Sequence, residues 1–186
     1  MAAWWLCLAC VGVGAAGSWL APALRAQEAS APEYQVKAAW LLNFTRFIDW
    51  PRESFAKPGD PIVVGVVGKD PFGAHLENAF AGKTVQGRPV LIKRLTADQN
   101  LKPCHLVFLS TAEKKRHREL LDRLKHAPIL TVGEADDFLE QGGVISFARK
   151  EGNVRFVINV DAAQAARIKV SAKLLGVALS VKGKYE

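Results

Sequence analysis

The chain has 186 residues, a formal net charge of +7 and a hydrophobic fraction of 49%, which together indicate one globular domain with its own core. Its Lys and Arg residues are scattered and form no basic groove with interleaved aromatics, so we expect no nucleic-acid partner.

The first 26 residues are typical of a secretory signal peptide. Residues 1–24 carry no charged side chain, their centre is nearly all apolar, and Ala26 offers a small residue for cleavage before a polar segment. A positively charged leading region is missing, and the apolar run is also about long enough for an uncleaved membrane anchor. We interpret the segment as a leader cleaved near Ala26. The exported chain then keeps 160 residues, a charge of +6 and Cys104 as a lone free thiol, which excludes an intrachain disulfide and a cysteine zinc cluster.

The exported part begins with a short polar terminus and a long amphipathic helix. Residues 27–33 are rich in Ala, Ser, Pro and Glu and predict a flexible N-terminus before a single domain at 34–186. Apolar residues then recur at helical spacing and form one wide stripe that stops at Trp50-Pro51, because proline disfavours helical geometry in the residue before it. The stripe consists of Val36, Ala39, Trp40, Phe44, Phe47 and Ile48.

Short apolar strands alternate with helices through the middle of the chain. The run at 62–68 is polar on neither face, which is typical of a strand covered on both sides. The same kinds of pattern predict strands at 85–95, 104–109 and 129–132, and helices at 70–80, 111–126 and 134–140.

The last part of the chain predicts a hairpin and a helical region. Strands at 144–147 and 154–160 flank a Lys-Glu-Gly-Asn turn, which indicates a β-hairpin. Asp161, with Gln164 as its reciprocal partner, is expected to cap a helical region that continues to about Leu179. The order of elements predicts the α/β class: a mostly parallel layered sheet flanked by helices, with a C-terminal antiparallel hairpin.

No group of residues has the spacing of a familiar catalytic or metal site. The glycines at 65 and 68 fit neither a dinucleotide fingerprint nor a phosphate-binding loop. Cys104 and His105 are adjacent on a predicted strand, so their side chains point to opposite faces and do not pair as nucleophile and base. We therefore expect a binding protein without catalytic residues, cofactor or metal.

The exported chain resembles the YfiR family over about residues 33–181. Each matching segment is short and unspecific, but the segments follow one another in the family's order. They are Lys37–Phe44 with Phe47 and Trp50-Pro51, Val66–Phe72, Cys104–Ser110, Leu130–Gly133, Gly142–Ile145, Val154–Asn159 and Ser171–Leu175.

This resemblance implies a periplasmic α/β protein that self-associates, as in a homodimer, and has no known catalytic activity. The best-studied member binds the periplasmic portion of an inner-membrane diguanylate cyclase and restrains it, and an outer-membrane lipoprotein relieves the restraint by sequestering the regulator. By resemblance, this chain lowers cyclic di-GMP and favours motility over biofilm. The best-studied member carries disulfides, whereas Cys104 stands alone here, so redox-dependent folding is not implied.

Three residues are candidates for partner or ligand binding. Trp50 is a large aromatic residue at the end of the first helix, where it can serve as a surface anchor. Arg155 and Asn159 share strand parity and form a polar exception in an apolar strand. Each also has a structural explanation: core packing for Trp50, an exposed sheet face for Arg155 and a cap at the strand end for Asn159.

Two further functions stay open from the residues. One is a solute-binding sensory module that holds a small ligand at the carboxyl ends of the strands. The other is an exported enzyme that uses Cys104 and His105.

Overall fold

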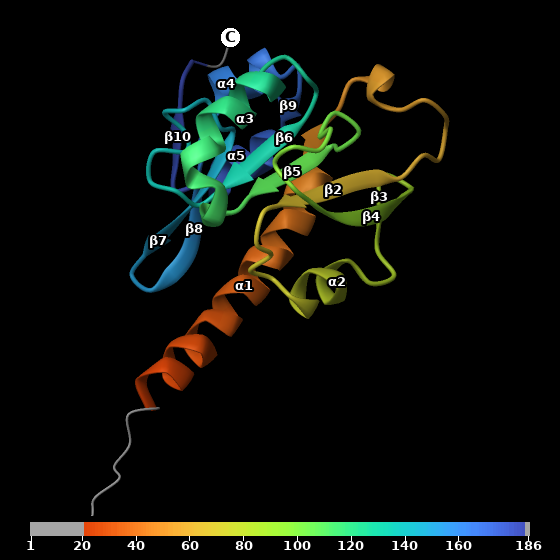
Figure 1. Ribbon diagram of the computed structural model, residues 1–186. Coiled ribbons are helices and arrows are strands. Elements are labelled where there is room, and N and C mark those ends of the chain that lie inside the picture. Colours follow the sequence, from red (N-terminus) through yellow and green to blue (C-terminus); the bar gives the residue numbers. More distant parts are fainter. Residues whose placement is uncertain (1–20, 185–186) are drawn as a thin grey trace, which may run out of the picture.

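A large twisted sheet forms the centre of the molecule, in a computed structural model that describes residues 21–184, with side chains from residue 32 onward (Figure 1). Its strands are β2 (Ile62–Val67), β3 (Thr84–Val85), β4 (Arg88–Leu95), β5 (Leu106–Leu109), β6 (Leu130–Gly133), β7 (Ile145–Lys150), β8 (Asn153–Asn159) and β10 (Ser180–Lys182). They pair in the order β10-β8-β7-β6-β5-β2-β4-β3.

The five strands from β4 to β7 in that order are mutually parallel, and β7 and β8 form an antiparallel hairpin. The predicted α/β class, with its mostly parallel sheet and C-terminal hairpin, is therefore confirmed. The hairpin does not form the edge of the sheet, because β10 pairs with β8 in parallel. Along the chain the sheet grows from β2 to β4 and then from the other side of β2 to β5, so the switch point of this doubly wound order lies between β2 and β5.

Helices cover both faces of the sheet, which explains why all six residues of β2 are buried. One core cluster joins Val64 and Val66 to α1 (Ala21–Phe47), α2 (Ala74–Phe80) and α5 (Ala172–Val177). The second joins Val63 and Val67 to α3 (His117–Leu124). Because successive side chains of a strand point to opposite faces of the sheet, the single apolar run of β2 contributes to both cores.

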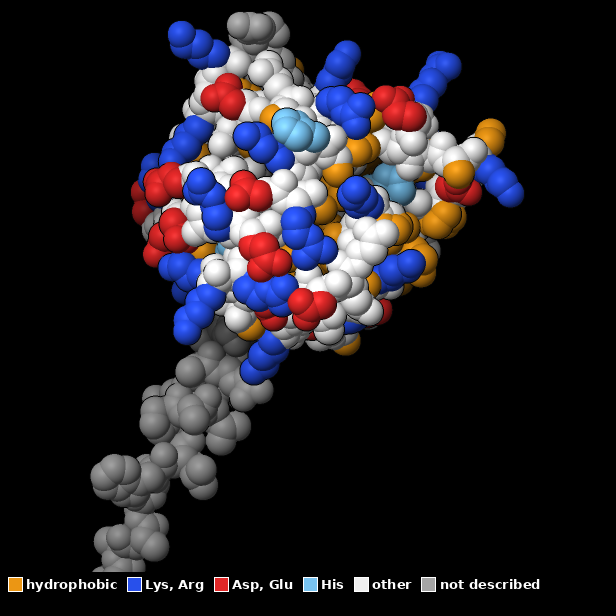
Figure 2. All heavy atoms as spheres, turned by 45° about the horizontal axis from the view of Figure 1, so that its top comes forward, with side chains coloured by type: hydrophobic (Ala, Val, Ile, Leu, Met, Phe, Trp, Pro, Cys, Tyr) orange, Lys and Arg blue, Asp and Glu red, His pale blue; other side chains and the backbone are white. Residues whose placement is uncertain are grey.

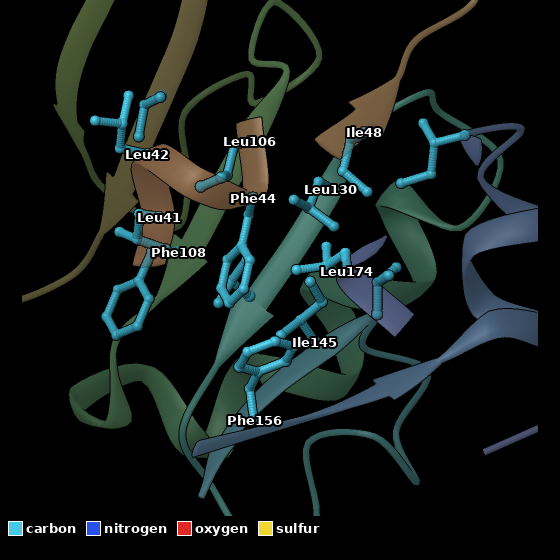
Figure 3. Close-up of a cluster of buried hydrophobic side chains, with 14 of the residues drawn as sticks. Leu41, Leu42, Phe44, Ile48, Leu106, Phe108, Leu130, Ile145, Phe156 and Leu174 are labelled. Carbon is cyan, nitrogen blue, oxygen red and sulfur yellow. The ribbon is translucent and has the colours of Figure 1, made fainter. Parts of the chain in front are cut away.

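The long helix α1 anchors the larger core through its C-terminal half. Phe44 is fully buried, and its ring lies 4.9 Å from that of Phe156 and 5.7 Å from that of Phe147 (Figure 3). The N-terminal half of α1 extends away from the sheet (Figure 1). It includes residues 27–33, for which the sequence predicts a flexible terminus once the leader is cleaved. Most of that leader, residues 1–20, lies outside the described residues.

The predicted end of the first helix and the predicted C-terminal helical region are both corrected by a small second sheet. The helix ends at Phe47, and β1 (Ile48–Asp49) pairs antiparallel with β9 (Lys169–Val170). The expected continuous helix is therefore interrupted after α4 (Val160–Ala165), where Arg167 has a φ of 56° that no α-helix accommodates. Ser171 then caps α5 by accepting a hydrogen bond from the Leu174 amide.

The helix predicted at 134–140 is wrong, because this segment is a series of tight turns. Phe138 is fully buried, and its ring lies directly against Gly133 and Gly143, where a Cβ atom would approach it to 2.5 Å and 2.2 Å. The turn folds back over Phe138, and the Gly143 amide donates a hydrogen bond to the Phe138 carbonyl oxygen. Close contact with two glycines, and not helical periodicity, therefore determines this segment.

Other helix starts also differ from expectation. The segment at 111–126 begins as a 3-10 helix, η2 (Thr111–Arg116), before α3. Asn159, not Asp161, caps α4 by accepting a hydrogen bond of 3.0 Å from the Ala162 amide. None of the helices within residues 21–184 is both long and apolar enough to cross a membrane.

Candidate functional site

Trp50 lies in an aromatic corner that it forms with Phe55 and His105. It is only 8% exposed, and its indole Nε1 donates a hydrogen bond of 3.1 Å to the His105 carbonyl oxygen. The Phe55 ring stacks on the His105 imidazole with centroids 4.5 Å apart. Trp50 therefore fixes the end of α1 to the sheet and reaches solvent only along one edge.

The His105 ring is held on both sides by backbone groups. Its Nδ1 accepts a hydrogen bond of 3.1 Å from the Val63 amide, so Nε2 carries the proton and donates to the Ser54 carbonyl oxygen at 3.1 Å. Burial lowers the pKa of His105, because the charged imidazolium is desolvated and would lose the hydrogen bond from Val63. The residue is thus a neutral structural histidine at pH 7.

The lowered pKa of His105 makes stability depend on pH in the acid range. Its unfolded form binds a proton near pH 6.5, whereas the folded form resists protonation. We expect the free energy of unfolding to be fully retained above pH 7 and to fall as the pH drops below 6.5. Thermal melts at pH 7.5 and pH 5.5 on the wild type and on His105→Gln check this. A pH-dependent loss of equal size in both proteins would contradict the assignment.

Beside the aromatic corner lies a hollow of about 450 Å³, which we call the corner hollow. Figure 2 shows hydrophobic side chains next to basic and acidic ones where the loop at 51–61 projects from the body. Arg88 stacks over Phe55 with its guanidinium carbon 3.8 Å from the ring centroid. The lining consists of Trp50, Arg52, Phe55, Ala56, Lys57, Pro58, Gln86 and Arg88.

The three predicted binding residues do not form one site. Arg155 is exposed on β8 opposite Ala148 and lies far from the aromatic corner. This position agrees with its structural explanation as part of an exposed sheet face. Asn159 stands about 13 Å further along the same strand, where it caps α4 and donates from Nδ2 to the Leu139 carbonyl oxygen. Arg155 and Asn159 share a strand face, and Asn159 borders a cavity.

That cavity, of about 310 Å³, lies between α3, the turn at 140–144 and α4. Apolar side chains such as Leu121 and Val144 form part of its lining, and charges of both signs, including Arg118 and Asp161, complete it. Ile129 and Thr131 place it at the amino end of β6. This is the edge opposite to the one where a ligand is expected in a parallel sheet.

The expected edge carries a buried ion network that the sequence analysis missed. Lys37 of α1 is 5% exposed, and its Nζ lies 2.5 Å from Glu134, which follows β6, and 2.7 Å from Glu33. Tyr34 donates a hydrogen bond of 3.1 Å to Glu134, and burial, reinforced by that carboxylate, raises the pKa of the tyrosine. These ion pairs join α1 to the end of β6, and the network borders a hollow of about 550 Å³ at this edge of the sheet.

Cys104 packs in the α3 core and makes no pair with His105, whose ring lies on the other side of the strand. The thiol is 4% exposed, and burial raises its pKa. A nucleophilic cysteine needs the reverse, an accessible thiolate with a lowered pKa. Within residues 21–184, no group of His, Cys, Asp and Glu residues has the arrangement of a metal site.

We expect the Cys104 thiol to be unreactive in the folded protein. A thiol reagent such as Ellman's reagent, added to the cleaved protein, should modify it only after denaturation, when one equivalent reacts. Fast modification of the folded protein, without loss of structure by circular dichroism, would contradict the burial.

The fold and these surfaces describe an α/β domain with hollows suited to binding. The YfiR/HmsC-like family model matches residues 34–179, so the chain belongs to this family. Members of the family are regulators and not enzymes, and membership indicates a periplasmic regulator of cyclic di-GMP signalling.

Comparison with individual proteins adds little. No curated protein sequence matches the chain significantly. A conserved domain protein from Vibrio cholerae, known from a crystal structure, is 14% identical, with a TM-score of 0.49. The similarity covers 65% of this chain and 55% of that one, so the chain spans about half of that protein's length.

Proposed function

We propose that this chain is exported, cleaved near Ala26, and then binds and inhibits the periplasmic portion of an inner-membrane diguanylate cyclase. The family match over residues 34–179 is the observation that carries this proposal. An outer-membrane lipoprotein that sequesters the chain, and a homodimer of the chain, belong to the same proposal.

Inhibition requires that the chain prefer one state of the cyclase. A regulator that bound the active and inactive states equally would shift nothing, however tight its binding. Cys104 is buried and His105 is held by backbone hydrogen bonds, so we expect the preference to come from a binding surface of the folded domain.

The test is deletion of the gene, followed by complementation. Cyclic di-GMP should rise in the deletion strain and return to its starting level when the full chain is restored. The matched control is the same chain without residues 1–26, which should fold in the cytosol and fail to restore the level. Unchanged cyclic di-GMP on deletion, or rescue by the leaderless chain, would contradict the proposal.

A small-molecule sensory module is the second candidate, and the cavity of about 310 Å³ beside Asn159 favours it. Its size falls in the range of about 300–1,000 Å³ that is usual for ligand sites. Its mixed apolar and charged lining suits a metabolite with both kinds of group.

Thermal-shift measurements with single amino acids, organic acids and sugars test this alternative, because a ligand that binds only the folded state raises the melting temperature. Ala165→Leu places a larger side chain at the cavity lining and should abolish any shift. Ala172→Leu, at an exposed position of α5, is the matched control. A shift that survives in Ala165→Leu would exclude this cavity as its source.

A further inference from the structure

We propose that the corner hollow is a docking site for an acidic segment of the protein partner. This inference rests on the proposed function for the existence of such a partner, but the chemistry comes from the hollow itself. Its charged lining residues are Arg52, Lys57 and Arg88, all cationic.

The cations of the corner hollow are available for an incoming carboxylate. Within the described residues, Arg52 and Lys57 make no ion pair and are exposed. Arg88 uses only Nη1, towards the carbonyl oxygens of Lys57 and Asp60, which leaves Nε and Nη2 to bind an acidic group. The neighbouring Asp60 carboxylate accepts a hydrogen bond of 2.7 Å from the Lys57 amide and, within the described residues, forms no ion pair with these cations.

The guanidinium of Arg88 is positioned before any partner binds. It stacks on Phe55, and the turn that precedes it forces Gln86 into a left-handed conformation with a φ of 53°. Such a conformation is unfavourable for a residue other than glycine. The Gln86 side chain supports it by donating a hydrogen bond of 3.1 Å to the Ile48 carbonyl oxygen, which connects the β3–β4 hairpin to the end of α1.

The shape of the hollow favours a peptide over a lipid surface. Trp50 and Phe55 give it an aromatic wall, and its volume of about 450 Å³ admits side chains. An anionic membrane is better met by a broad convex face of Lys and Arg with no enclosed wall. An extended segment of Glu or Asp with an apolar residue between them matches both the cations and the aromatic wall.

Trp50 provides the readout. Of the five tryptophans in the chain, only Trp40 and Trp50 remain after residue 26, so Trp40→Phe makes Trp50 the single tryptophan of the cleaved protein, whose emission is excited selectively at wavelengths that tyrosine does not absorb. This protein is titrated with the capped peptide Glu-Glu-Leu-Glu-Glu. The same peptide with Gln in place of every Glu is the control ligand. We expect the acidic peptide to change the fluorescence of Trp50 to a saturating value, and added salt to weaken this binding. The Gln peptide should leave the fluorescence unchanged.

The decisive variant is Arg52→Gln/Lys57→Gln, which removes two exposed cations. It should weaken peptide binding by about tenfold, as two lost charge contacts would. Lys102→Gln/Lys173→Gln removes the same charge at exposed positions outside the hollow and should leave binding unchanged. Arg88→Gln should weaken binding further, with near-UV circular dichroism as a check that the loop keeps its structure.

The same variants are then tested in cells. Arg52→Gln/Lys57→Gln should raise cyclic di-GMP towards the level of the deletion strain, while the control variant should not. Four outcomes would each overturn the inference. In solution they are no binding of the acidic peptide, equal weakening of binding by both double variants, or binding to phosphatidylglycerol vesicles but not to the peptide. In cells it is a cyclic di-GMP level that Arg52→Gln/Lys57→Gln keeps as low as the wild type does. If deletion itself leaves cyclic di-GMP unchanged, the proposed function fails, and the peptide titration alone decides the site.

Discussion

Replacing Phe44 by alanine is expected to lower the free energy of unfolding by about 3–5 kcal/mol, the usual cost of removing a fully buried aromatic ring. Phe44 is 0% exposed and contacts the rings of Trp40, Phe147 and Phe156, so the surrounding side chains have little room to fill the cavity. The substitution also removes the ring that connects α1 to the β7–β8 hairpin. Urea denaturation of the cleaved protein measures the difference.

Val36→Ala is the control for Phe44→Ala, because it shortens a side chain of the same helix that is 45% exposed. Its effect should lie within about 0.5 kcal/mol of zero. If the two substitutions destabilise the protein to a similar extent, α1 does not pack on the sheet as described.

Lys37→Met is expected to destabilise the protein by about 3 kcal/mol, because it leaves the largely buried Glu134 carboxylate without its cation, and Glu33 then keeps only the Arg149 guanidinium at 3.2 Å. The side chains of Glu33 and Glu134 are 16% and 10% exposed, and both lie within 3 Å of the Lys37 ammonium. Methionine fills a similar volume, so the change measures charge and not packing. The free energy of unfolding, again from urea denaturation at neutral pH, gives the result.

A second substitution separates this ion network from a general effect of charge. Glu134→Gln in the Lys37→Met background should recover part of the loss, since it removes the unpaired charge. Lys173→Met, at an exposed position of α5, should change stability by less than about 0.5 kcal/mol. A Lys37→Met protein as stable as Lys173→Met would show that the network contributes nothing.

The parts of the fold that follow from local pattern are predictable from the sequence. The all-apolar run of β2 and the turn between β7 and β8 depend on neighbouring residues alone. The missed parts depend on distant contacts. Phe138 needs the glycines on either side of its turn, and β9 exists only because β1, more than a hundred residues earlier, pairs with it.

The binding surfaces were less accessible to sequence reasoning. The sequence predicts Trp50 as a surface anchor, whereas the residue is only 8% exposed, and its hydrogen bond to His105 spans 55 residues and has no local sign. The contact between Lys37 and Glu134 spans 97 residues. The i,i+4 spacing of Glu33 and Lys37, which pair in α1, is the local trace of this network in the sequence.

The short strand β10 also protects the hairpin from other molecules. It pairs Ser180, Val181 and Lys182 with the outer edge of β8, and all three residues are exposed. Without it, the backbone N–H and C=O groups at the end of β8 would face solvent and could template pairing with another chain. Removal of the residues after Leu179 would therefore leave this edge of β8 open to pairing with another chain, and the lysine-bearing strand β10 prevents such pairing.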